Sequence, residues 1–173
     1  MEVIPLQKIE DLLDPAFADG LDRRTDEELR DMKSRCAVVE TTLSYYRRLA
    51  QGRIEILEAW SQRRAKGGSL ESLVADLPQI LAPPSSRPGT AQARVAEPAP
   101  DVEPLDLGGR ERLVQDDGTL AELPLLDDST LAARIDELRE FEREVSELRR
   151  AMHGVTDGFE LELATRQAAG TAG

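Results

Sequence analysis

The distribution of proline most constrains the fold of this chain, because proline interrupts both helices and sheet ladders. Eight of the ten prolines lie between Pro78 and Pro124. Two long segments, about residues 25–66 and 129–166, contain none. The sequence therefore predicts two long uninterrupted elements that are joined by a segment of different character.

Both proline-free segments carry an apolar heptad repeat. In the first, positions a and d are Leu29, Cys36, Leu43, Ala50 and Leu57, and Met32, Val39, Tyr46, Arg53 and Trp60. In the second, they are Leu131, Leu138, Val145, Met152 and Phe159, and Arg134, Phe141, Leu148, Val155 and Glu162. A narrow apolar seam is typical of a coiled coil, and neither helix would be stable alone in water. We therefore predict an all-α fold built on a two-helix coiled coil.

Helix-boundary residues support these limits. Thr25 and Glu28 fit a capping box, and Gly67 with Gly68 supplies a stop for the first helix. The cluster 127–129 can cap the second helix. The predicted organisation is a short N-terminal helical segment (1–24), a first coiled-coil helix (25–66), a linker (67–128), a second coiled-coil helix (129–166) and a disordered tail (167–173).

The predicted linker is acidic and rich in proline. Residues 67–128 contain 12 acidic and 4 basic residues, and residues 82–104 are of low complexity. Such a composition favours disorder over a packed core, so we predict a largely disordered linker. The apolar pieces that flank it are either parts of a solvated tether or short docking motifs for a partner.

Composition excludes several classes of function. A net charge of −12 argues against general nucleic-acid binding and against an anionic membrane surface. Aromatic residues make up only 3%, which is too few for the core of an α/β enzyme. A single cysteine and a single histidine exclude an internal disulfide and a histidine-rich zinc site. There is no apolar run of 18 residues, and the acidic start does not resemble a signal peptide. We expect a cytoplasmic protein without a metal.

The two helices also share a polar pattern. At an offset of 102 residues, Glu40, Ser44, Arg47, Arg48 and Gly52 align with the identical residues Glu142, Ser146, Arg149, Arg150 and Gly154. Gln51 then aligns with His153, and Glu55 with Asp157. A five-position identity by chance is on the order of one in 100,000 per starting position. The chain therefore contains an internal duplication with the pattern E-x3-S-x2-R-x3-[QH]-x3-[ED].

The spacing of this pattern places its members on one side of each helix. Offsets of 0, 4, 7, 11 and 15 residues stay within roughly an 80° stripe, which runs beside the apolar seam. An antiparallel hairpin would bring the two stripes together on one face, whereas a parallel pair would separate them. A linker of about 60 residues can span either arrangement.

The residue types in the stripe suit an anionic ligand that contains guanine. Arginine presents planar donors to phosphate or to guanine O6 and N7, and carboxylates accept from guanine N–H groups. Gly52 and Gly154 each cost roughly 1 kcal/mol in a helix, which makes sense where a ligand approaches the backbone. The alternative is that these charges merely solvate the coiled coil and set the choice of partner.

The repeated pattern resembles the signature of the RsiG family, the cyclic-di-GMP-dependent anti-sigma factors of actinobacteria. The resemblance covers both helices, about 80 residues. It implies an antiparallel coiled coil whose motif face binds an intercalated dimer of cyclic di-GMP. It further implies that the loaded protein holds a WhiG-type sigma factor away from core RNA polymerase, so that late sporulation genes stay off.

The resemblance also implies the ligand-binding residues. By position they are Glu40, Ser44, Arg47, Gln51 and Glu55 in the first copy, and Glu142, Ser146, Arg149, His153 and Asp157 in the second. His153 stands where the signature has glutamine, and Glu55 stands where it has aspartate. No nucleophile–base pair and no phosphate-binding loop indicates an enzyme. The remaining alternative is a coiled-coil adaptor that binds no nucleotide.

Overall fold

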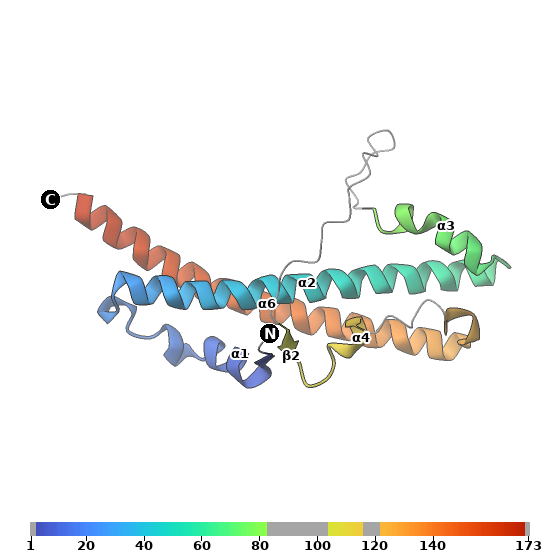
Figure 1. Ribbon diagram of the computed structural model, residues 1–173, viewed down its shortest axis with the longest axis horizontal. Coiled ribbons are helices and arrows are strands. Elements are labelled where there is room, and N and C mark those ends of the chain that lie inside the picture. Colours follow the sequence, from blue (N-terminus) through green and yellow to red (C-terminus); the bar gives the residue numbers. More distant parts are fainter. Residues whose placement is uncertain (1–2, 83–103, 116–121, 172–173) are drawn as a thin grey trace. The chain divides into compact units, whose positions relative to one another are not determined.

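The computed structural model describes residues 3–82, 104–115 and 122–171, and these are mainly helical (Figure 1). The elements in chain order are β1 (Ile4–Pro5), α1 (Leu6–Leu13), the 3-10 turns η1 (Pro15–Ala18) and η2 (Leu21–Arg23), α2 (Asp26–Ala65), α3 (Leu70–Ile80), β2 (Leu105–Asp106), α4 (Arg112–Gln115), the 3-10 turn η3 (Leu123–Leu125) and α6 (Asp128–Thr171). The prediction of an all-α fold with two long helices that pack against each other is confirmed.

The described residues form two compact units, and both long helices contribute to each of them. The first unit comprises residues 3–45, 104–111 and 144–171; the second comprises residues 46–82, 112–115 and 122–143. Within each unit, a part of α2 packs along a part of α6.

The ion pairs between the helices show their relative direction. In the first unit, Lys33 Nζ lies 2.7 Å from Glu160 Oε1, and Arg166 Nη1 lies 2.8 Å from Asp26 Oδ1. The contacts of α2 thus move toward its start as those of α6 move toward its end. The helices of this unit are therefore antiparallel, which is the arrangement that brings the two motif stripes to one face.

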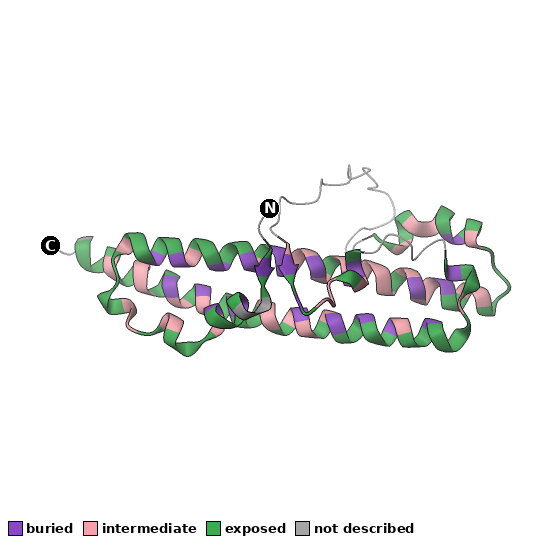
Figure 2. Cartoon of the chain, turned by 60° about the horizontal axis from the view of Figure 1, so that its bottom comes forward, coloured by how far each residue is buried: buried purple, intermediate pink, exposed green. Residues whose placement is uncertain are grey.

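The core of each unit follows the heptad seam, visible in Figure 2 as buried residues that recur along the long helices. Every position a of both heptads is buried. Position d of α2 is also buried except at Arg53, but in α6 only Phe141 of the d positions is. Instead, Ile135 and Thr156 at position e are buried in α6. A straight helix of 3.6 residues per turn drifts against a 3.5-residue repeat, which accounts for the shared d and e rows.

Side-chain caps begin both long helices. Thr25 Oγ1 accepts from the Glu28 backbone N–H at 3.2 Å, and Glu28 Oε2 accepts from the Thr25 N–H at 2.7 Å, which confirms the predicted capping box. Asp127 Oδ1 accepts from the Thr130 N–H at 2.7 Å before α6. Helix α6 continues to Thr171, so residues 167–171 of the predicted tail are helical.

The end of α2 turns the chain back onto the helix. Gly67 has a φ of +74°, a conformation that suits glycine, and the Gly68 N–H donates to the Arg63 carbonyl at 2.9 Å. Helix α3 then docks through Leu73, which is fully buried, and through an ion pair of 2.7 Å between Arg63 and Asp76.

In the first unit, the start of the chain packs with a segment from far along the sequence. Strands β1 and β2 pair in parallel, and the Ile4 N–H donates to the Pro104 carbonyl at 2.8 Å. The amphipathic start forms α1, which buries Ile9 and Leu12. The ring of Phe17 packs edge-on against Phe159 at 5.9 Å. These segments form a layer against the coiled coil of this unit.

In the second unit, described parts of the predicted linker are also ordered. Leu123 in η3 is fully buried, and its carbonyl accepts from Trp60 Nε1 at 3.1 Å. Val114 in α4 is buried as well. This packing differs from the solvated tether, one of the two alternatives left open for the flanking apolar pieces, because these pieces pack on the long helices of the same chain. Most of the low-complexity stretch, residues 83–103, lies outside the described residues.

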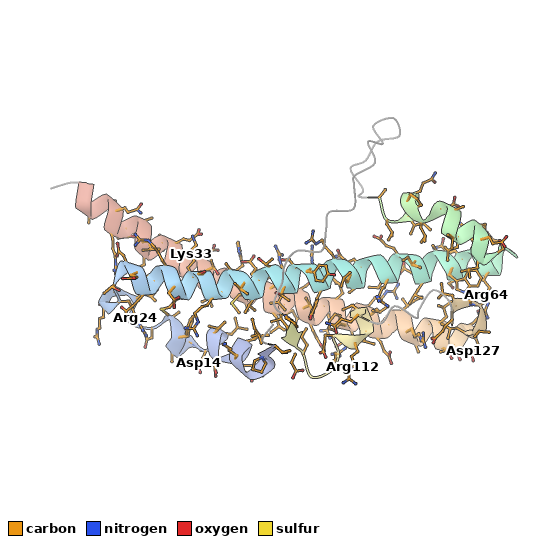
Figure 3. The ribbon with its side chains drawn as sticks, viewed as in Figure 1. Asp14, Arg24, Lys33, Arg64, Arg112 and Asp127 are labelled. Atoms are coloured by element: carbon orange, nitrogen blue, oxygen red, sulfur yellow. The ribbon has the colours of Figure 1, made fainter. Side chains whose placement is uncertain are left out.

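The cap at Asp127, which Figure 3 shows at the start of α6, makes stability depend on pH. Hydrogen bonds from Thr130 and Ser129 lower the pKa of Asp127 to about 2. A carboxyl whose pKa falls on folding stabilises above its unfolded pKa of about 3.9, and this contribution is lost as pH falls toward 2. Asp127→Asn should still cap but not titrate. We expect its thermal midpoint to fall less than that of the wild type between pH 4 and pH 2, measured by circular dichroism.

Cys36 is a packing residue of the seam in the first unit. Its side chain is fully buried, and burial raises the pKa of its thiol to about 11. Thiolate is therefore scarce at pH 8 and the sulfur is inaccessible. A thiol reagent should label Cys36 slowly in the native protein and rapidly in denaturant. Rapid labelling of the native protein at pH 8 would contradict this account.

Candidate functional site

The ten predicted site residues all lie on α2 and α6, divided between the two units. The first unit contains Glu40, Ser44, Ser146, Arg149, His153 and Asp157. The second unit contains Arg47, Gln51, Glu55 and Glu142. Each unit thus combines residues from both copies of the motif. We call these two groups the first-unit cluster and the second-unit cluster.

The clusters lie beside the apolar seam of the long helices. Glu142 and Arg149 occupy position e of α6, the row in which Ile135 and Thr156 are buried. Both are half-buried, as are most of the other site residues, whereas Glu55, His153 and Asp157 are exposed. Half-buried charged groups are costly unless they are paired or bind something. We therefore expect the half-buried charged residues of the clusters to have partners on the other helix or to bind a ligand.

In the first-unit cluster, residues of one motif copy contact residues of the other. Arg149 Nε donates to Ser44 Oγ at 2.8 Å. His153 Nδ1 lies 3.4 Å from Glu40 Oε1, and Nε2 of the same ring lies 3.7 Å from Asp157 Oδ1. The Arg149 guanidinium and the His153 imidazole are thus both held at the surface between the two helices.

The second-unit cluster contains the equivalent of one of these contacts. Gln51 Nε2 donates to Glu142 Oε1 at 3.1 Å. Gln51 and His153 occupy the fourth position of the motif, whereas Glu142 and Glu40 occupy the first. The same pairing of first and fourth positions across the helices therefore occurs in each unit. His153 in place of glutamine preserves this pairing.

Arg47 differs from the second motif arginine in having a free guanidinium. Among the described residues, the Arg47 side chain has no hydrogen bond or ion pair, although it is half-buried. Most other arginines of the long helices that the structure describes do have a carboxylate partner, as Arg139 has Glu58 at 2.7 Å. A free, half-buried guanidinium is available to an anion or to a guanine edge.

In the first unit, the layer of β1, α1 and β2 covers a different flank of the coiled coil. Arg110, just after β2, forms an ion pair with Glu144, which occupies position g of α6. Arg35, also at position g, lies over the Phe17 ring at 6.0 Å. Positions e and g lie on opposite sides of a coiled-coil seam. The layer therefore packs on the g flank, and the motif occupies the e flank.

Other kinds of site find no support in the described chain. Among the residues that the structure describes, no group of three or more histidine, cysteine, aspartate or glutamate side chains could hold a metal ion. Within the same ranges, no helix has the length and apolar character that a membrane span requires.

The pairing within the clusters was not predicted from the sequence. The constant offset of 102 residues between the two copies could have indicated this pairing. In an antiparallel pair, a duplicated motif places position one of each copy opposite a late position of the other. We assigned the side chains to a ligand only, whereas several of them also contact each other.

Comparison with known proteins agrees with the motif. A protein-family model described as RsiG-like matches residues 15–81 and 117–173, more than two thirds of the chain. The matched segments include all ten site residues and leave out β1, α1 and β2. Among curated proteins there is no match. The coverage of both long helices shows that the chain belongs to the RsiG-like family.

Proposed function

We propose that this chain is an anti-sigma factor gated by cyclic di-GMP and acting in the cytoplasm. Loaded with a dimer of the nucleotide, it sequesters a WhiG-type sigma factor and blocks late sporulation transcription. The observation that carries the proposal is the duplicated motif, whose first and fourth positions pair across the helices in each unit. A duplicated site suits a ligand that is itself a dimer with twofold character.

The chemistry of the two clusters fits the parts of this nucleotide. Arg47 and Arg149 can each donate to guanine O6 and N7 or to a phosphate oxygen. The motif carboxylates can accept from the N–H groups of the guanine Watson–Crick edge, and Ser44 and Ser146 can donate to phosphate. Cyclic di-GMP offers two guanines and two phosphates, so two copies of such a set match one dimer better than one copy does.

The contacts within the clusters prepare the site and also compete with the ligand. Arg149 is held by Ser44, and Gln51 by Glu142. These hydrogen bonds position the side chains before binding, which lowers the entropic cost of ordering them. A ligand that uses the same donors must replace the contacts, so part of its binding free energy goes into the exchange.

A protein partner would complete the site. An open coiled-coil face covers only one side of a nucleotide, which limits the surface that binding can bury. If the sigma factor covers the other side, nucleotide and sigma factor each raise the affinity of the other by the same factor. We therefore propose reciprocal coupling between cyclic di-GMP and a WhiG-type sigma factor, with no direct nucleic-acid or membrane contact.

The test is complex formation between the purified chain and the WhiG-type sigma factor, measured by size-exclusion chromatography. We expect a stable complex with cyclic di-GMP and none with cyclic di-AMP, because adenine lacks the O6 acceptor and the exocyclic amino group of guanine. Complex formation that is equally strong without nucleotide would contradict the gating and leave a coiled-coil adaptor. No complex under any condition would contradict the anti-sigma function.

A further inference from the structure

Each copy of the motif contains two further identical residues outside its five signature positions. Arg48 and Gly52 in the first copy correspond to Arg150 and Gly154 in the second. In each copy the glycine follows the arginine by four residues, which is about one turn of the helix. The arginine in turn follows the motif serine by four residues. Arginine and glycine therefore lie on adjacent turns, next to the signature stripe.

The two arginines are exposed and free. Among the described residues, neither guanidinium has an ion pair or a hydrogen-bond partner. The chain has 34 acidic residues against 22 basic ones, and Arg139, Arg143 and Arg166 of α6 all have carboxylate partners. Other arginines of the described chain also lack a carboxylate partner, but Arg48 and Arg150 recur at equivalent positions of the duplication.

The packing does not require the two glycines. Among the described residues, a Cβ atom at Gly154 would meet nothing within 4 Å, and one at Gly52 would meet only Leu81 Cδ2, at an ordinary contact distance of 3.6 Å. Both glycines lie inside a long helix, where alanine would stabilise the helix more than glycine does. The fold therefore gives no reason for glycine at either position, although the duplication has it twice.

We propose that Arg48 with Gly52, and Arg150 with Gly154, each form a phosphate-binding notch that extends the motif. The bare backbone at the glycine lets a phosphate approach the helix beside the guanidinium, and a methyl group there would fill that space. This inference rests on the proposed function, because the phosphates belong to the same guanine dinucleotide. It adds four residues outside the signature to the phosphate contacts of Ser44 and Ser146, and it leaves Arg47 and Arg149 for the guanines.

The two notches differ in their cover. In the second unit, Leu81 at the end of α3 lies over Gly52. In the first unit, no described residue covers Gly154. Leu81 is itself 46% exposed and can move aside more readily than a core residue. The open notch at Arg150 and Gly154 is therefore the one where substitutions have the larger effect.

The first test removes the arginines. In calorimetric titrations with cyclic di-GMP in the presence of the sigma factor, Arg48→Ala/Arg150→Ala should weaken binding by about tenfold or more, the loss expected for charged hydrogen bonds. The matched control is Arg23→Ala/Arg112→Ala, which removes two exposed arginines that have no partner among the described residues and changes the net charge equally. Equal losses in both variants would reduce the effect to net charge and overturn the notch.

The second test fills the notch without changing any charge. Gly154→Ala should raise the thermal midpoint by about 2–4 °C yet weaken cyclic di-GMP binding several-fold. Gly158→Ala, also in α6 with open space at its Cβ, should raise the midpoint similarly and leave binding unchanged. Unchanged binding by Gly154→Ala would overturn the inference alone. If the wild-type protein does not bind cyclic di-GMP even with the sigma factor, both the inference and the proposed function fail.

Discussion

Replacing both Arg47 and Arg149 with alanine is expected to abolish measurable binding of cyclic di-GMP. The substitutions remove one guanidinium from each copy of the motif, that of Arg47, which has no partner among the described residues, and that of Arg149, which is held by Ser44. Charged hydrogen bonds contribute about 1.5–3 kcal/mol each, so the loss of both sites should lower affinity at least a hundredfold. Calorimetric titration of the variant measures the change directly.

The control for this variant is Arg30→Ala/Arg139→Ala, which removes two arginines of the long helices outside the motif. Both are exposed and form exposed ion pairs, with Asp26 and Glu58 respectively, which contribute little to stability. We expect wild-type affinity from the control and unchanged helicity in both variants by circular dichroism. Binding by Arg47→Ala/Arg149→Ala at wild-type affinity would show that the motif is not the nucleotide site.

The largest effect on stability is expected from Phe159→Ala. Phe159 is fully buried at position a of α6 and packs against Phe17 from the layer of the first unit. Truncation of a buried phenylalanine leaves a cavity and typically costs about 3–5 kcal/mol of unfolding free energy. Denaturant unfolding, followed by circular dichroism, should therefore show a strongly lowered midpoint.

A matched substitution is available two residues further along the same helix. Leu161 is 71% exposed, so Leu161→Ala should change the unfolding free energy by less than about 0.5 kcal/mol. If both variants unfold at the wild-type midpoint, then α6 does not pack against the layer as the structure describes. If both are strongly destabilised, Leu161 has a buried role that its exposure does not show.

The long helices could be predicted from the sequence, because several independent signals agree on them. Absence of proline, the heptads and the caps at Thr25 and Asp127 all point to the same two segments. The pairing of β1 with β2 could not be predicted in this way. It involves two residues on each side, about 100 positions apart, and no periodic signal exists in so short a strand.

The composition of the linker concealed its ordered parts for a similar reason. Acidic, proline-rich sequence predicts disorder on average. A single leucine such as Leu73 or Leu123 can still be buried where it packs against a long helix, and composition does not reveal this. The swap from position d to position e along α6 was also not predicted, since it depends on how closely the helix follows a 3.5-residue repeat.

The membership of the candidate site could be proposed from the sequence, but its internal contacts could not. The duplication singled out Ser44 and Arg149, because the packing of a coiled coil does not require a serine or an arginine beside its apolar seam. Which side chains meet depends on the axial stagger of the two helices, and the heptad leaves that stagger open. The hydrogen bond between Ser44 and Arg149 and the pairing of Gln51 with Glu142 required the structure.

The most direct test of the account is the affinity and stoichiometry of cyclic di-GMP for the full chain, measured by calorimetry with and without the WhiG-type sigma factor. We expect two nucleotides per chain and a higher affinity when the sigma factor is present, by the same factor by which the nucleotide raises the affinity for the sigma factor. The absence of binding in both conditions, from a protein whose helicity is intact, would contradict it.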